Sequence, residues 1–153
     1  MTLKYKNTSF DLKAVSDDGF FSGYASVFGN VDSYGDVVVA GAFAETIAEW
    51  STRGKMPPVL WNHRTDEPIG MYTLMKEDAH GLYVEGQLLA SAVKRASEVL
   101  ALMKAGVIDG LSIGYEVQDY KRSVDDEITE LLKIKLWEVS IVTFPANELS
   151  RIE

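Results

Sequence analysis

The sequence predicts an α+β fold in which a mainly antiparallel β-barrel, or a strongly curved sheet, is surrounded by a few helices. Many short or medium runs have the apolar patterning of strands and are bounded by turn-forming residues. Only two segments carry apolar residues at helical spacing, which argues against a parallel doubly wound sheet. The chain has 153 residues, of which 46% are hydrophobic, so we expect one core and a single domain spanning residues 1–153.

The N-terminal half is expected to contain a hairpin, a helix and a buried strand. Residues 3–15 and 20–28 are the predicted strands of the hairpin, joined by an Asp-Asp-Gly turn. A short amphipathic helix follows over residues 41–50 and is closed by Gly54. Its apolar face consists of Phe43, Ile47 and Trp50. After two prolines, residues 59–62 are typical of a buried strand.

The C-terminal half is expected to contain two hairpins separated by a helix. Residues 69–76 and 81–89 form the first predicted hairpin. Ser91 is the predicted N-cap of the second helix, whose apolar face consists of Ala96, Val99, Leu100 and Met103. Residues 111–121 and 128–144 are then the two longest predicted strands, joined by a polar tip.

Charge and composition narrow the function classes. The chain has 15 basic and 23 acidic residues, a net charge of -8, which is the wrong sign for neutralising phosphates and argues against nucleic-acid binding. The absence of Cys excludes disulfides, thiolate nucleophiles and Cys-based metal sites. Residues 1–10 lack the apolar run of a signal peptide, and no stretch has 18 uninterrupted apolar residues. We therefore expect an intracellular protein that does not bind a membrane.

Three separate strand-like runs each carry one polar group that is suited to acyl-transfer chemistry. These groups are the hydroxyl of Ser112, the imidazole of His63 and the carboxylate of Glu138. Burying an unpartnered polar group costs about 1–3 kcal/mol, and more for a charge. If the three meet, each gains a partner, and the result is the nucleophile, base and acid of a serine hydrolase.

Ser112 is the candidate nucleophile. It lies between Gly110 and Gly114, and such small neighbours would let a substrate backbone approach its hydroxyl. The expected order of helix, turn and strand is the reverse of the nucleophile elbow of α/β-hydrolases. The alternative is an ordinary strand start with a small residue at a crowded point.

His63 is the candidate base, because a neutral imidazole can accept a hydroxyl proton near neutral pH. It is expected at the end of the strand over residues 59–62, on the same face as Val59 and Trp61. The alternative is a structural histidine bonded to the backbone. His80, the second histidine, lies in a polar turn where we expect it to be solvated.

Glu138 is the candidate orienting acid. Both faces of its predicted strand are otherwise apolar, so its carboxylate needs a partner, which could be His63. A salt bridge to Lys121 or Arg122 of a neighbouring strand is the equally weighted alternative.

We predict no metal site and no cofactor. Asp32 and Asp36 lie in a polar loop, but the loop lacks the spacing and the distal Glu of a calcium loop, so a turn closed by side-chain to backbone bonds is the better interpretation. Two histidines on separate elements, with no Cys, leave too few ligands for zinc.

Five stretches, in this order along the chain, form a series that is more specific than any one of them. They are FSGYASVFGN (residues 21–30), GDVVVAGAF (35–43), PVLWNH (58–63), GLSIGY (110–115) and LWEVSIVTFPAN (136–147). The series resembles the motifs of the tailed-bacteriophage prohead (capsid maturation) serine proteases. This resemblance implies a herpesvirus-assemblin-like fold, and it makes residues 1–153 a prohead protease catalytic domain.

The resemblance also implies an activity and partners. Members of this family are endopeptidases that digest scaffold inside the immature capsid, in the host cytoplasm, and process themselves. The substrate would be scaffold or major capsid protein, and a homodimer is possible because the herpesvirus relatives dimerise. The family's catalytic residues fall on His63, Ser112 and Glu138. The herpesvirus relatives use a second histidine as the third member, but the motif context of His80 does not match.

Two other functions and one processing event stay open at this point. A non-catalytic capsid-assembly or scaffolding module with the same fold would bind capsid protein without cleaving it. An esterase would act on small molecules. The end of the sequence at Glu153, soon after the last motif, suggests a self-processed C-terminus.

Overall fold

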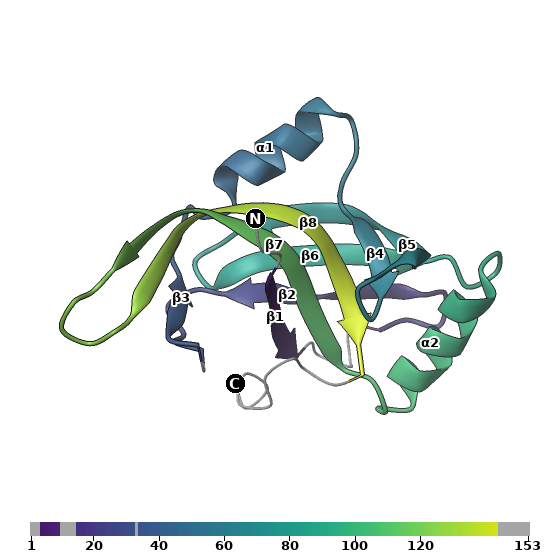
Figure 1. Ribbon diagram of the computed structural model, residues 1–153. Helices are drawn as coiled ribbons and strands as arrows, with labels where there is room; N and C mark the ends of the chain where they lie inside the picture. The colour runs from purple at the N-terminus through teal and green to yellow at the C-terminus, as the bar shows by residue number, and fades with distance from the viewer. Residues whose placement is uncertain (1–3, 10–14, 33, 144–153) are drawn as a thin grey trace.

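A computed structural model describes residues 4–9, 15–32 and 34–143. Within these residues the chain forms one eight-stranded sheet and two helices (Figure 1). The elements are β1 (Lys4–Ser9), β2 (Phe20–Val27), β3 (Asp36–Val38), α1 (Ala44–Thr52), β4 (Pro58–Trp61), β5 (Arg64–Glu77), β6 (Gly81–Leu88), α2 (Lys94–Lys104), β7 (Gly110–Arg122) and β8 (Thr129–Val142).

The sheet is curled, with the strand order β1-β7-β8-β4-β5-β6-β2 and with β3 beside β8. The strands at the two ends of this path, β1 and β2, come into contact, so the sheet curls almost into a barrel (Figure 1). This confirms the predicted class of a curved, mostly antiparallel sheet accompanied by two helices. The exceptions are β3 and β4, which pair parallel to β8.

The β7–β8 hairpin supplies the surface on which two of the candidate residues lie. Its register places Ser112 opposite Ser140 and Gly114 opposite Glu138. Because side chains alternate along a strand, these residues share one face, whereas the intervening residues face the apolar core. The fully buried apolar neighbours are Leu111, Ile113, Val139 and Ile141.

The β4–β5 hairpin differs from the predicted strand over residues 59–62. Trp61 pairs with Arg64, so Asn62 and His63 form a two-residue turn. Both turn residues have positive φ, 49° for Asn62 and 61° for His63, as the type I′ turns of tight hairpins require. His63 therefore belongs to a turn and does not share a strand face with Val59 and Trp61, which corrects the sequence-based expectation.

Helix α1 fills a gap along one edge of β8. That edge pairs with β3 near one end of β8 and with β4 near the other, which leaves the backbone of Leu136 between them. Thr46 Oγ1 accepts a hydrogen bond from Leu136 N–H at 2.9 Å, and Trp50 Nε1–H donates to the Leu136 carbonyl at 2.8 Å. Side chains of α1 thus satisfy backbone groups that a neighbouring strand would otherwise satisfy.

The start of α1 is held from β5. Both carboxylate oxygens of Glu77 accept backbone hydrogen bonds, from Gly41 N–H at 2.8 Å and from Phe43 N–H at 2.7 Å. The helix itself begins at Ala44, three residues later than predicted, because residues 41–43 form a turn.

Helix α2 has the predicted apolar face, since Ala96, Val99, Leu100 and Met103 are all buried. Its predicted N-cap is wrong: Val93 occupies that position, in an extended conformation, and no side chain caps the helix. Ser91 therefore lies before the helix. No helix among the described residues has the length and apolarity needed to cross a membrane.

Two strand predictions extend beyond the described residues. Of the first predicted strand, residues 4–9 form β1, Val15 is not in a strand, and residues 3 and 10–14 lie outside the described ranges. The same ranges exclude residue 144 and the C-terminal stretch through Glu153 on which the self-processing expectation rests. The predicted hairpin of the first strand with residues 20–28 is wrong, because β1 pairs with β7 and β2 pairs with β6.

Candidate active site

The structure brings Ser112, His63 and Glu138 together from three different elements. His63 Nε2 lies 2.7 Å from Ser112 Oγ, and His63 Nδ1 is hydrogen-bonded to Glu138 Oε1. Ser112 and Glu138 are buried, at 0% and 6% exposure, whereas the His63 side chain is 18% exposed. The imidazole therefore bridges a buried hydroxyl and a buried carboxylate.

With Glu138 ionised, the hydrogen bonds fit one tautomer of a neutral His63 ring. An ionised carboxylate can only accept, so Nδ1 carries the proton that is donated to Glu138. In the neutral ring, Nε2 is then an unprotonated acceptor, and it faces the Ser112 hydroxyl. This is the tautomer that a general base acting on Ser112 requires.

The backbone of the β4–β5 turn places His63 across β8. Strand β4 runs parallel to β8, with Val59 opposite Val139 and Trp61 opposite Ile141, so the turn that follows lies over the end of β8. Asn62 N–H donates to the Ile141 carbonyl at 3.0 Å, and His63 N–H donates to Ser140 Oγ at 2.9 Å. From this position the imidazole reaches over β8 to β7.

Glu138 occupies a site shaped by its neighbours on both strands. Its Oε1 contacts His63, and its Oε2 accepts a hydrogen bond from Ser140 Oγ at 2.6 Å. A Cβ atom on Gly114, which lies opposite, would be 2.4 Å from Oε1, so only glycine leaves room for the carboxylate. The alternative salt bridges are not formed, because the β7–β8 register pairs Lys121 and Arg122 with Glu130 and Thr129.

Tyr72 on β5 supports the same region from the core. Its hydroxyl donates to the Val139 carbonyl at 2.9 Å, directly beside Glu138 in the chain. Burial, and to a smaller extent the negative charge of Glu138, raise the pKa of Tyr72 well above its ordinary value. Tyr72 is therefore a neutral hydrogen-bond donor at any physiological pH.

Sequence reasoning missed Ser140, Tyr72 and the steric role of Gly114. Ser140 had one usable signal: it is two residues from Glu138 and therefore shares its strand face. Tyr72 had none, because its contact with Val139 joins strands that are distant in sequence.

The remaining candidate residues lie elsewhere. His80 is in the turn between β5 and β6, where its ring packs edge-on against Tyr24 at 4.5 Å. Asp32 Oδ1 accepts the backbone N–H groups of Tyr34 and Asp36, each at 2.9 Å, as the turn interpretation predicted. Among the described residues no three His, Cys, Asp or Glu side chains are grouped as a metal site would need.

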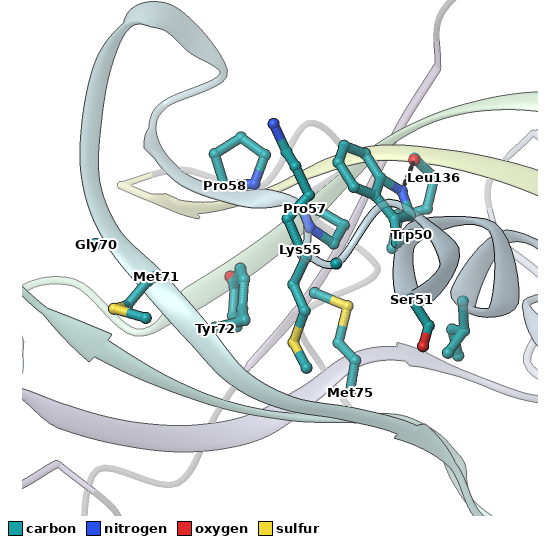
Figure 2. Close-up of a pocket in the computed structure, with 13 residues that line it drawn as sticks. Trp50, Ser51, Lys55, Pro57, Pro58, Gly70, Met71, Tyr72, Met75 and Leu136 are labelled. Atoms are coloured by element: carbon teal, nitrogen blue, oxygen red, sulfur yellow. Dashed lines mark hydrogen bonds between the residues drawn. The ribbon is translucent and has the colours of Figure 1, made fainter.

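A hollow of about 720 Å³ lies between α1 and β5 (Figure 2). Trp50, Met71, Tyr72 and Met75 contribute much of its largely apolar lining, with Lys55 beside them. The described residues that line it do not include Ser112, His63 or Glu138. The hollow is therefore separate from the candidate active site.

The sequence is similar to two prohead proteases and a capsid polyprotein of bacteriophages. A prohead protease of Enterobacteria phage HK97 is 37% identical over 154 residues, covering 99% of this chain and 66% of the relative. A prohead protease of Escherichia phage T5 is 29% identical over 117 residues, covering 76% and 54%. A capsid polyprotein of Pseudomonas phage PAJU2 is 34% identical over 99 residues, covering 61% and 15%. This chain spans less than two thirds of the length of each of them.

A solved structure of similar fold and a family model agree with these sequence matches. The bacteriophage T4 capsid assembly protease superposes with a TM-score of 0.72 over 94% of this chain and 98% of that one, at 11% identity, which is a likeness of fold. The family model of the caudovirus prohead serine protease matches residues 8–153, nearly the whole sequence. The resemblance in the five motifs is thereby confirmed, and this chain belongs to the caudovirus prohead serine protease family.

Proposed function

We propose that this chain is a serine endopeptidase that cleaves scaffold or capsid protein, and its own chain, during prohead maturation inside the immature capsid in the host cytoplasm. The observation that carries the proposal is the 2.7 Å contact between His63 Nε2 and Ser112 Oγ, with Glu138 bonded to the other ring nitrogen. Family membership and the names of the relatives support the choice of a capsid-maturation substrate.

The first chemical step forms an acyl-enzyme. His63 Nε2 takes the Ser112 proton while Ser112 Oγ attacks the scissile carbonyl carbon, and the resulting imidazolium then gives that proton to the leaving amine. Glu138 stabilises the imidazolium, because the two opposite charges share a hydrogen bond in a buried site. Water then replaces the amine, His63 removes a proton from it, and hydrolysis of the ester releases the acid and regenerates Ser112.

A non-catalytic assembly module is the second candidate function. One observation favours it: Ser112 is fully buried in the isolated chain, so a peptide carbonyl cannot reach its hydroxyl without movement of the atoms that cover it. The two functions make opposite predictions about whether Ser112 can be acylated.

Labelling of the purified protein with a fluorophosphonate, followed by peptide mapping, tests the proposal. We expect modification at Ser112, loss of labelling in Ser112→Ala and His63→Ala, and a rate lower by roughly 10⁴-fold in Glu138→Gln. Ser26→Ala is the matched control, since Ser26 is also a buried strand serine but its hydroxyl has no hydrogen-bond partner among the described residues.

The outcomes separate the functions. Labelling at Ser112 that requires His63, together with cleavage of co-expressed scaffold or capsid protein, establishes the endopeptidase. Labelling without protein cleavage supports hydrolysis of small esters. Binding of capsid protein by a chain that is never labelled, whether dilute or concentrated, rejects the catalytic function in favour of the assembly module.

A further inference from the structure

We propose that Ser140 is a positioning residue that fixes both the acid and the base of this site through one hydroxyl group. The inference rests on the proposed function and deepens it. Ser140 lies on β8, is 0% exposed, and is hydrogen-bonded to Glu138 and to the backbone of His63. Although it lies opposite Ser112 in the β7–β8 register, its hydrogen bonds join it to His63 and Glu138, so its effect on the chemistry passes through these two neighbours.

The direction of both hydrogen bonds follows from the donors available. The His63 backbone N–H can only donate, so Ser140 Oγ is the acceptor of that bond at 2.9 Å. The single proton of the Ser140 hydroxyl is then free for Glu138 Oε2, at 2.6 Å. A bond of this kind, from a hydroxyl to a carboxylate, is of the stronger, charge-assisted type.

The two bonds and the His63–Glu138 contact form a closed ring. It runs from His63 N–H to Ser140, from Ser140 to Glu138, and from Glu138 back to His63 Nδ1. The His63 backbone is thus linked to the Glu138 carboxylate through Ser140, and the His63 side chain is linked to it directly. Because each bond restricts the next, the ring fixes the imidazole orientation more tightly than the contact with Glu138 alone.

The conformation of His63 makes such a restraint necessary. His63 has φ of 61°, in the left-handed region that residues with a Cβ rarely adopt. Asn62 also ties the turn to this part of the chain, through its N–H bond to the Ile141 carbonyl and through the bond from Thr143 N–H to its Oδ1, but neither bond holds His63 itself. A small rotation of the turn would move Nε2 away from Ser112, and a misplacement of about 1 Å costs on the order of 10² in rate.

The test compares Ser140→Ala with Ser26→Ala, which removes a buried serine hydroxyl that has no hydrogen-bond partner among the described residues. With a fluorophosphonate, which phosphonylates serine with release of fluoride, we expect Ser140→Ala to lower the maximal rate of Ser112 labelling roughly 10²-fold while the reversible binding constant stays unchanged. Ser26→Ala should change neither. Ser140→Cys keeps a weak donor of similar shape and should lose less of the rate, which also covers the case in which Ser140→Ala folds poorly.

A double-mutant cycle separates positioning from a merely structural role. If Ser140 acts through the ring, adding Ser140→Ala to Glu138→Ala should lower the rate of Ser112 labelling by about tenfold or less. That is far less than the effect of Ser140→Ala in the wild-type background. Equal losses in both backgrounds would show that Ser140 contributes independently of Glu138 and would overturn the inference.

Proton NMR gives a readout that does not depend on activity. The His63 Nδ1 proton bonded to Glu138 should give a strongly downfield resonance that shifts or broadens in Ser140→Ala and stays in place in Ser26→Ala. An unlabelled wild-type protein would count against the proposed function, whereas an unchanged resonance in Ser140→Ala would count against the role of Ser140 alone.

Discussion

At the scale of single residues, Gly114 controls whether the acid of the site can occupy its place. We predict that Gly114→Ala lowers the rate of Ser112 labelling by at least roughly 10²-fold. The new Cβ would lie 2.4 Å from Glu138 Oε1 and would push the carboxylate away from His63. Labelling rates, measured together with thermal unfolding, check this expectation.

Gly110→Ala is the matched control for Gly114→Ala. Gly110 is on the same strand and the same face, but its Cβ would meet a side-chain methyl of Val142, at 2.9 Å, and not the carboxylate. Both changes should lower the melting temperature, and only Gly114→Ala should lower labelling more than its stability explains. If the labelling rate falls in the same proportion to the melting temperature in both variants, Gly114 matters for packing alone.

The sequence could predict which residue types meet in this site but not how they are held. Ser112, His63 and Glu138 were identified because each is polar in an apolar run. The two glycines around Ser112 were interpreted as access for a substrate, whereas Gly114 instead makes room for Glu138. That contact depends on the register of β7 against β8, which no local pattern specifies to the residue.

At the scale of elements, the contact between α1 and β8 can be tested by removing one hydroxyl. We predict that Thr46→Val, which keeps the side-chain shape, destabilises the protein by about 1–3 kcal/mol, because the buried Leu136 N–H loses its acceptor. Thr52→Val is the control, since exposed Thr52 donates within the same helix, to the Ala48 carbonyl. Chemical denaturation gives both values, and equal effects would contradict the role assigned to Thr46.

The elements that follow local patterns were predictable, and those that depend on distant partners were not. The apolar spacing predicted the buried face of α2, and turn residues predicted the β5–β6 and β7–β8 hairpins. In α1, by contrast, Ile47 and Trp50 are only half-buried, and the buried residue of the helix is Thr46. The parallel pairing of β4 with β8 was missed because it joins Val59 to Val139, far along the chain. The Asn62-His63 turn was missed because His is an unusual residue at positive φ.

At the scale of the whole molecule, buried phenols make folding sensitive to alkaline pH. Burial chiefly raises the pKa of both Tyr72 and Tyr115 well above the ordinary value of 10.0, with smaller contributions from nearby negative charges, Glu138 for Tyr72 and Asp36 for Tyr115. The folded chain therefore keeps protons that the unfolded chain releases above about pH 10. Their contribution to stability is complete below that pH and is lost as the pH rises towards the folded-state values.

We predict that the free energy of unfolding falls above about pH 10, with each buried tyrosine adding up to about 1.4 kcal/mol per pH unit to the slope. Tyr72→Phe and Tyr115→Phe should each remove the contribution of one tyrosine to this slope. Tyr120→Phe should leave the slope unchanged because Tyr120 is 61% exposed. Denaturant titrations between pH 9 and 11 measure the slope, and an identical slope in all four proteins would refute this account.

Tyr72→Phe also removes the hydrogen bond to Val139, so its stability should be lower at neutral pH as well. Because Tyr72 contacts the strand that carries Glu138, the same variant would reveal whether loosening β8 from the core also slows acylation at Ser112.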